Sequence, residues 1–525
     1  MTSFQHPAEG TAMPHARGIQ PKVWLRHGTL SCRITTSMTP EPASRFPELP
    51  AEVRNLTLLG TFKIFGPGVI IASVTIGSGE TVFPSRSGAL FGYSLLWCFA
   101  LGTVIKGFQI YSGSRFMTLT GRHPLESWSE LPGPRAWFVW AMTIMSLVCM
   151  PLFLGGGLPR MLADFTVSGV VGFTPAPGNL EEKQLFDLYA CLWGTLFILV
   201  AITLTWLQSY NFLEKVQTVI IGLLLFSIFV AVLSSQPEVM AVLKGLVVPA
   251  IPTFEPWVRD LPEFSNRDPW VEVIVGIGVF GGGTQDYFGY LGLLREKSWG
   301  LMSRVGSPDE KTDWNVDRSP ENVVTGKIWL RAPLIDVSFS FAAILFFALC
   351  FAVLGAVVLH PEHKVPAGKE LLTQQLDFLL REGQSPLFQS FLNLLYKTGI
   401  FFAFFGTIHG AYELYTRTTH ECLTVAIPRL RNVSLGKFRV ATVSVLGVTG
   451  LTSLWCSLDP VRVITPAAII SSALTCGLWC FAMIWSDRTH LPAELRMKWP
   501  LVLAVILSGI ALTIFGVTGL TMWLA

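Results

Sequence analysis

The sequence has little charge and lacks the short motifs that mark common soluble enzymes. Only 14% of its 525 residues are charged, whereas soluble domains contain roughly 25%. It has no phosphate-binding P-loop, no His-Glu-x-x-His pair and no Gly-x-Ser-x-Gly turn. These absences give no support to an enzymatic function, and we expect none. The net charge of +3 is too small to indicate a nucleic-acid partner.

The cysteines show no pattern that is typical of disulfides or metal ligands. Cys476 and Cys480 lie one helical turn apart, but no histidine or acid accompanies them to complete a metal-binding set. We interpret the cysteines in apolar runs as small packing residues. These are Cys98, Cys149, Cys191, Cys350, Cys456, Cys476 and Cys480.

The first 60 residues also lack a continuous apolar stretch, so they do not resemble a secretory signal. They are rich in Pro, Thr, Ser and His, and their basic residues outnumber their acids. Residues 1–60 are therefore predicted to form a disordered cytoplasmic tail. A translation start at Met38 and an organellar transit peptide are alternative interpretations of this segment.

Apolar runs, in contrast, are abundant. Hydrophobic residues make up 51% of the chain, and several runs exceed the ~20 residues that a helix needs to cross a bilayer. The sequence predicts an all-α polytopic membrane protein whose transmembrane domain covers residues 61–525. Eleven spans are predicted, near residues 64–88, 92–117, 136–159, 187–207, 214–235, 270–294, 333–359, 388–415, 438–457, 462–485 and 500–523.

The loop charges indicate an orientation for these spans. With a cytoplasmic N-terminus, the cytoplasmic loops hold about twice as many Lys and Arg residues as the opposite loops, as the positive-inside rule requires. The longest loops, residues 236–269 and 295–332, are predicted to carry short surface helices.

The first and sixth predicted spans are interrupted by glycines that are followed by an acid. TIGSGE ends at Glu80 and GGGTQD ends at Asp286. Non-helical backbone inside a bilayer is tolerated only where it is buried in protein or lines a water-filled cavity. A matching pair of interrupted spans indicates an inverted-repeat transporter, here with repeats near 64–235 and 270–485 and an additional helix near 500–523. Close glycine packing between helices is the alternative.

With both interruptions placed, the chain from Gly66 onward resembles the Nramp family of proton-coupled divalent-metal transporters. GPGVIIASVTIGSGE resembles the family's first helix, LLWCFALGTVIKGFQIYSGSRFMTLTGRHPLE the second, and GGGTQDYFGYLGLLREK the sixth. The resemblance implies a LeuT-type 5+5 inverted repeat with broken helices 1 and 6. It is nearest to a divergent bacterial branch, which implies a bacterial inner (plasma) membrane.

The family's two metal-binding signatures are altered in this chain. Asp-Pro-Gly-Asn of the first helix and Met-Pro-His-Asn of the sixth are both replaced, and a family histidine one turn later aligns with Tyr290. The resemblance implies a substrate site at the aligned positions. They are Gly77, Ser78, Gly79 and Glu80 in the first helix and Gly283, Thr284, Gln285 and Asp286 in the sixth.

Glu80 and Asp286 are the predicted metal ligands. Thioether sulfur favours softer metals, whereas carboxylates, carbonyls and water favour Mg²⁺, Ca²⁺ and Mn²⁺. Loss of the family's methionine and gain of two carboxylates therefore favour a harder divalent cation, with Ser78, Thr284 and Gln285 completing its shell. This cation is the substrate, and no cofactor is predicted.

Lys106, His409 and Tyr290 are the candidates for a proton or charge relay. Lys106 lies midway along the second span, so its ammonium either pairs with Glu80 or Asp286 or reaches toward the surface. His409 either relays protons or is a packing histidine.

Two further charged residues lie near the ends of spans. Arg115 is predicted to anchor the cytoplasmic end of the second span, and Asp336 to face the membrane interface at the start of the seventh.

These features predict a secondary active transporter that moves a divalent cation by alternating access, with proton coupling as a hypothesis. The alternative is transport of an amino acid or other small organic solute on the same fold, where Lys106 would help to bind it. A non-transporting receptor or channel-like scaffold is a third class. The oligomeric state does not follow from the sequence.

Overall fold

In the computed structural model, the described residues are helices and connecting segments, with one isolated bridge between Ser44 and Val316. The structure describes residues 44–57, 60, 64, 79–176, 178–207, 222–223, 225–304, 316–365, 372, 385–456 and 460–524. Gly77, Ser78 and most of the predicted tail therefore lie outside the described residues.

Seven helices among the described residues are long and apolar enough to cross a membrane, and they match predicted spans 3, 4 and 7 to 11. The second span is α5 (Leu96–Thr120). The fifth span is described only in part, as a helix over Leu225–Ser234. The axis of this helix makes an angle of 118° with that of the following α11 (Val239–Val247). The seven are Trp137–Val170, Leu180–Trp206, Pro320–Leu359, Pro386–Ala426, Leu435–Cys456, Arg462–His490 and Trp499–Leu524.

Several of these spans contain more than one helical element. The third contains α7 (Trp137–Leu152), η1 (Phe153–Gly157), α8 (Leu158–Phe165) and η2 (Thr166–Val170). The seventh contains α15 (Pro320–Trp329), α16 (Arg331–Leu354) and η4 (Gly355–Leu359). The tenth contains α19 (Pro460–Ala468), η8 (Ile469–Leu474) and α20 (Thr475–His490).

The sixth span is broken as predicted, whereas the predicted break in the first span lies outside the described residues. The described part of the first span is α4 (Gly79–Phe91), which contains Glu80. The sixth consists of α13 (Pro269–Val279) and α14 (Thr284–Lys297), with residues 280–283 between them. All eleven predicted spans therefore have helical counterparts, although the first and fifth are described only in part.

The third span extends past its predicted end because buried charges there are neutralised within the protein. Arg160 ended the apolar window, yet its side chain is fully buried and bonds Asp164 at 2.8 Å and Asp187 at 2.6 Å. A buried charge that is paired and hydrogen-bonded can remain inside a helical bundle. The helix consequently continues to Val170 through α8 and the π-helical turn η2.

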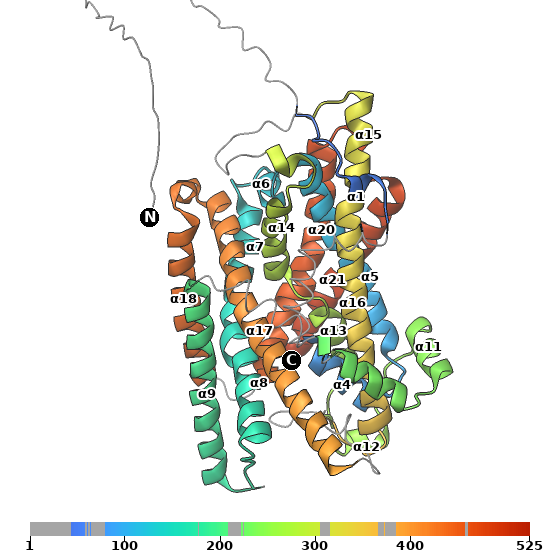
Figure 1. The fold of residues 1–525 in the computed structure, drawn as a ribbon, viewed down its shortest axis with the longest axis vertical. Helices are drawn as coiled ribbons and strands as arrows, with labels where there is room; N and C mark the ends of the chain where they lie inside the picture. The colour runs from blue at the N-terminus through green and yellow to red at the C-terminus, as the bar shows by residue number, and fades with distance from the viewer. Residues whose placement is uncertain are drawn as a thin grey trace, which may run out of the picture. The chain divides into compact units, whose positions relative to one another are not determined.

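Corresponding spans of the two repeats pack beside each other. The second span, α5, contacts the seventh, α16, and the fourth, α9 (Leu180–Trp206), contacts the ninth, α18 (Leu435–Cys456). Figure 1 shows α9 and α18 running next to each other. The third span likewise contacts the eighth, α17 (Pro386–Ala426).

The halves of the broken sixth span lie against elements from both repeats and the additional helix. α13 contacts α4, α5, η8 and α21 (Trp499–Leu524), and α14 packs mainly on α17. The break between α13 and α14 is therefore enclosed by protein, as non-helical backbone at membrane depth requires.

The predicted loop helices are present. Residues 236–269 contain α11 and α12 (Pro256–Arg259), and residues 295–332 contain η3 (Gly300–Arg304) and α15.

Within the predicted tail, the described residues 44–57 include α1 (Ala51–Arg54). The Phe46 ring lies against Gly326 of α15, and the Phe46 amide donates to Asn322 Oδ1 at 2.7 Å. The prediction of a disordered tail thus concerns residues 1–43, which lie outside the described residues.

Glycines set the distance between α4 and the seventh span. A Cβ atom added at Gly88 would lie 2.0 Å from the carbonyl oxygen of Ala352, and one at Gly355 would lie 2.2 Å from that of Ser85. Both are distances that real Cβ atoms do not show, so the two backbones touch through their glycines, as is common between membrane helices.

Gly88→Ala is expected to destabilise the protein, because the methyl group would force α4 away from α16. Gly107→Ala in α5 is the matched control, since a Cβ there would have no neighbour within 4 Å and alanine favours a helix by ~1 kcal/mol. Thermal unfolding of the purified variants checks this. Equal melting temperatures for Gly88→Ala and Gly107→Ala would contradict the close contact.

Candidate substrate site

The break in the sixth span exists because two of its glycines adopt backbone angles that other residues avoid. Gly281 has φ of +75° and Gly282 has φ of +88°, both in the left-handed region where glycine has no steric penalty. A Cβ at Gly281 would also lie 3.0 Å from the ring of Phe341. The turn between α13 and α14 therefore depends on glycine at these positions.

Lys106 of α5 holds the carbonyl groups that this turn releases. Its Nζ donates to the carbonyl oxygens of Gly278 at 2.6 Å, Phe280 at 2.6 Å and Gly282 at 2.8 Å. The side chain is fully buried, so the prediction that it reaches the surface is wrong. Among the described residues it forms no ion pair with Glu80 or Asp286 either, because its three donors are bound to backbone carbonyls.

The two candidate acids bind the amides of the same turn. The Gly281 N–H donates to Glu80 Oε1 at 2.8 Å, and the Gly283 N–H donates to Asp286 Oδ2 at 2.7 Å. The Tyr287 hydroxyl donates to the Gly281 carbonyl at 2.7 Å. Asp286 occupies the first turn of α14, where the helix dipole favours a negative charge. The structure thus brings Glu80, Asp286 and Lys106 together around one turn.

The other predicted residues of the sixth helix face the tenth span. The Thr284 hydroxyl lies 2.6 Å from that of Thr475 and 3.4 Å from Cys476 Sγ. A Cβ at Gly283 would lie 2.7 Å from Ser472 Oγ and 2.8 Å from Gln285 Oε1. Gly283, Gln285 and Ser472 are therefore close neighbours.

Several buried polar atoms near the turn have no hydrogen-bond partner among the described residues. They include Glu80 Oε2, Gln285 Oε1 and both amide atoms of Gln109. A buried polar atom without a partner is unfavourable, and oxygens of this kind are the ligands that hard cations take. No group of three or more His, Cys, Asp and Glu side chains that could hold a metal occurs in the described parts of the chain. A cation here would therefore need amide or other neutral ligands as well.

Sequence reasoning missed Gln109 and Ser472 as residues of this region. Gln109 follows Lys106 by one helical turn, so the buried lysine was the available signal. Ser472 lies in η8 of the tenth span, and no local feature of the sequence marks it as a neighbour of the sixth.

Tyr290, at the position of the family's histidine, is paired with an acid in the seventh span. Its hydroxyl donates to Asp336 Oδ2 at 2.8 Å, and both side chains are fully buried. The prediction that Asp336 faces the interface is therefore wrong, because it serves as a partner inside the bundle. His409 is also buried, within α17, and its role in a relay stays a prediction.

Arg115, the predicted anchor of the second span, is also buried. Its Nη1 bonds Asp487 Oδ1 at 2.5 Å, and its Nη2 donates to the Leu495 carbonyl. This ion pair joins the end of α5 to the end of α20 and the turn that follows it.

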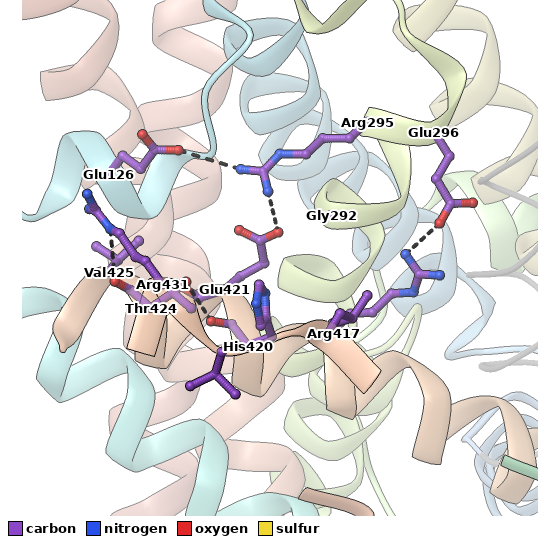
Figure 2. A pocket seen from close by; sticks show the side chains of 12 residues that line it. Glu126, Gly292, Arg295, Glu296, Arg417, His420, Glu421, Thr424, Val425 and Arg431 are labelled. Carbon is purple, nitrogen blue, oxygen red and sulfur yellow. Dashed lines mark hydrogen bonds and ion pairs between the residues drawn. The ribbon is translucent and has the colours of Figure 1, made fainter. Parts of the chain in front are cut away.

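A pocket of about 310 Å³ lies at the end of α14 that is remote from the break. Figure 2 shows Arg295 between Glu421 and Glu126, with N–O distances of 2.6 Å and 3.5 Å, and Arg417 bonded to Glu296 at 2.6 Å. Glu126 also accepts the His123 N–H in a capping box at the start of α6. These ion pairs tie α14 to α17 and to α6 (Pro124–Trp128).

Comparisons with known proteins agree with this architecture. The profile of the family described as natural resistance-associated macrophage protein-like matches residues 68–523. A divalent metal cation transporter MntH of Erwinia tasmaniensis is 27% identical over 196 residues, and one of Pectobacterium carotovorum is 26% identical over 195. These alignments cover 37% and 36% of this chain, and in both cases 42% of the relative. The chain thus spans less than half the length of these curated relatives.

Solved structures share the fold at low sequence identity. A mutant of the Eremococcus coleocola manganese transporter aligns with a TM-score of 0.62 and 14% identity, over 91% of this chain and 89% of that one. MhsT in complex with L-phenylalanine aligns with a TM-score of 0.53 and 13% identity, over 87% of this chain and 98% of that one. The fold is therefore of the LeuT type, and the chain is an integral membrane protein that belongs to the Nramp family.

Proposed function

We propose that this protein is a secondary active transporter that moves a divalent cation, of the Mn²⁺, Mg²⁺ or Fe²⁺ kind, by alternating access. The observation that carries the proposal is the buried turn between α13 and α14, where Glu80 and Asp286 each bind one backbone amide. Family membership supports it, as do the relatives named divalent metal cation transporters.

The candidate ligands are hard oxygen donors. Glu80 Oε2, Gln285 Oε1 and the Gln109 carboxamide are buried and have no partner among the described residues, and Asp286 adds a second carboxylate nearby. Carboxylate and amide oxygens suit Mg²⁺ and Mn²⁺ better than soft metals. Gly77 and Ser78 remain proposed contributors, and Thr284 is bound to the tenth span through Thr475.

The broken helices give this site a route to alternating access. Glu80 links α4 to the α13–α14 turn, so a cation bound to its free oxygen would act on both broken spans at once. Rocking of one set of helices against the other around a fixed midplane site is the usual mechanism of such folds.

An organic cargo is less well supported than a cation. The attraction of Lys106 for a substrate carboxylate was the main argument for an amino acid. Its ammonium has three donors, and three backbone carbonyls accept them. The likeness to the L-phenylalanine complex of MhsT concerns the fold alone.

Proton coupling and membrane location complete the proposal. We place His409 and the Tyr290–Asp336 pair in the coupling path, because they are buried polar groups on α17, α14 and α16. The loop charges favour a cytoplasmic N-terminus, and the likeness to bacterial relatives favours a bacterial inner membrane. No step of this function requires an enzymatic reaction or a bound cofactor.

Glu80→Gln is expected to lower Mn²⁺ uptake into proteoliposomes about tenfold or more, because a charge that faces the cation is lost. Expression of the variant is expected to remain intact. A tenfold loss corresponds to ~1.4 kcal/mol. Glu181→Gln is the control, because that residue is exposed at the start of α9. Normal uptake by Glu80→Gln would rule out this site.

Competition between ions tests the ligand set. Because the candidate ligands lack sulfur, the Mg²⁺ concentration that halves Mn²⁺ uptake is expected to be within about tenfold of the concentration of unlabelled Mn²⁺ that does so. The protein is expected to show no preference for Cd²⁺ over Mn²⁺. A strong preference for Cd²⁺ would indicate a soft ligand outside this set. An amino-acid panel that is taken up while every metal is ignored would favour the organic alternative.

Tyr290→Phe is expected to reduce uptake driven by a pH gradient about tenfold, because Asp336 loses the hydroxyl that binds it. Uptake at equal pH on both sides is expected to change less. Residues in one network show non-additive effects, so the double variant with Asp336→Asn should lose little more than either single variant. Equal losses with and without the gradient would indicate a purely structural role.

A further inference from the structure

Lys106 has an unusual set of partners for a lysine buried inside a membrane protein. Its ammonium has three N–H donors and no acceptor, and the carbonyl oxygens of Gly278, Phe280 and Gly282 lie at 2.6, 2.6 and 2.8 Å. Every donor therefore has one backbone acceptor. Such a charge costs ~3 kcal/mol or more at membrane depth, and no carboxylate within ion-pair distance among the described residues offsets it.

Carbonyl groups of this kind form cation sites. The C-terminal end of a helix carries a partial negative charge. α13 ends at Val279, between the first two of the residues whose carbonyls accept from Lys106. Rings of backbone carbonyls replace the water around K⁺ in channels, and unwound carbonyls coordinate Na⁺ in transporters. The three oxygens around Lys106 Nζ have the same chemistry.

We infer that Lys106 is a tethered cation that fills a carbonyl cation site at the α13–α14 break and thereby determines which ligands remain for the cargo. The carbonyls of Gly278, Phe280 and Gly282 are unavailable to a free ion while the ammonium is present. The cargo is restricted to the side-chain oxygens beside them, those of Glu80, Asp286 and Gln285. The statement about cargo rests on the proposed function, whereas the cation site itself does not.

The fixed charge also sets the electrostatic balance of the region. With both carboxylates ionised, Glu80, Asp286 and Lys106 sum to a charge of about −1, and a bound divalent cation changes it to about +1. Without the lysine the same region has a charge of about −2, which matches a divalent cation. Lys106 therefore weakens cation binding and keeps the turn intact when the cargo leaves.

The cation site is tested by thermal unfolding of Lys106→Ala, which opens space at the three carbonyls. Purified variant is heated in choline chloride, in potassium chloride and in ethylammonium chloride. We expect a lower melting temperature than wild type in choline, with recovery in potassium or ethylammonium. Gly107→Ala and wild type are expected to show no such difference. A Lys106→Ala protein that melts identically in all three salts would overturn the inference.

The effect on cargo is tested with Lys106→Gln, which keeps two of the donors and removes the charge, so it remains informative if the alanine variant does not fold. Mn²⁺ binding by calorimetry is expected to tighten about tenfold or more. Equal Mn²⁺ affinity in this variant and wild type would overturn the role in selectivity. If wild type and variant both ignore Mn²⁺, the proposed function fails, while the salt-dependent melting still decides whether the carbonyls form a cation site.

Discussion

The bond of one ammonium to three carbonyls is the interaction on which this architecture depends. A break in a membrane helix exposes backbone groups that have no water to bind, and each unsatisfied group would cost several kcal/mol, of the order of ~2–7. Lys106 donates to the carbonyls of Gly278, Phe280 and Gly282. Glu80 and Asp286 accept from the amides of Gly281 and Gly283. The charged side chains and the broken backbone thus stabilise one another, and neither would be tolerated alone at this depth.

The same principle governs the other charged groups within the bundle. Arg160 bonds Asp164 and Asp187, and Arg115 bonds Asp487, so each buried guanidinium meets a carboxylate. These pairs join neighbouring spans and fix where each helix ends. Removing one partner of a buried pair commonly costs ~3–5 kcal/mol. The pairs therefore stabilise the helices that surround the break. At the break itself, by our proposal, the polar groups bind a ligand.

Membership of the Nramp family and loss of its site signatures are compatible because fold and cargo depend on different residues. The fold rests on helix packing through glycines such as Gly88 and Gly355, and on the broken sixth span. The proposed cargo site consists of a few side chains at the break, and a fold commonly keeps its form while such a site changes. In this chain the break carries a cation of its own, so the chemistry beside it differs from that expected of the family signatures.

The sequence by itself indicated the spans, the break in the sixth span and the acids Glu80 and Asp286, because apolar length, glycine runs and intramembrane charge are local signals. It also placed Lys106 at membrane depth. Only the tertiary structure decided its partners, because three backbone carbonyls that lie about 170 positions away leave no mark in composition or spacing. For the same reason the structure alone paired Tyr290 with Asp336 and carried the third span past Arg160. A hydropathy average over neighbouring residues shows where each charge lies in the sequence. It does not show which opposite charge or carbonyl the fold places beside that charge.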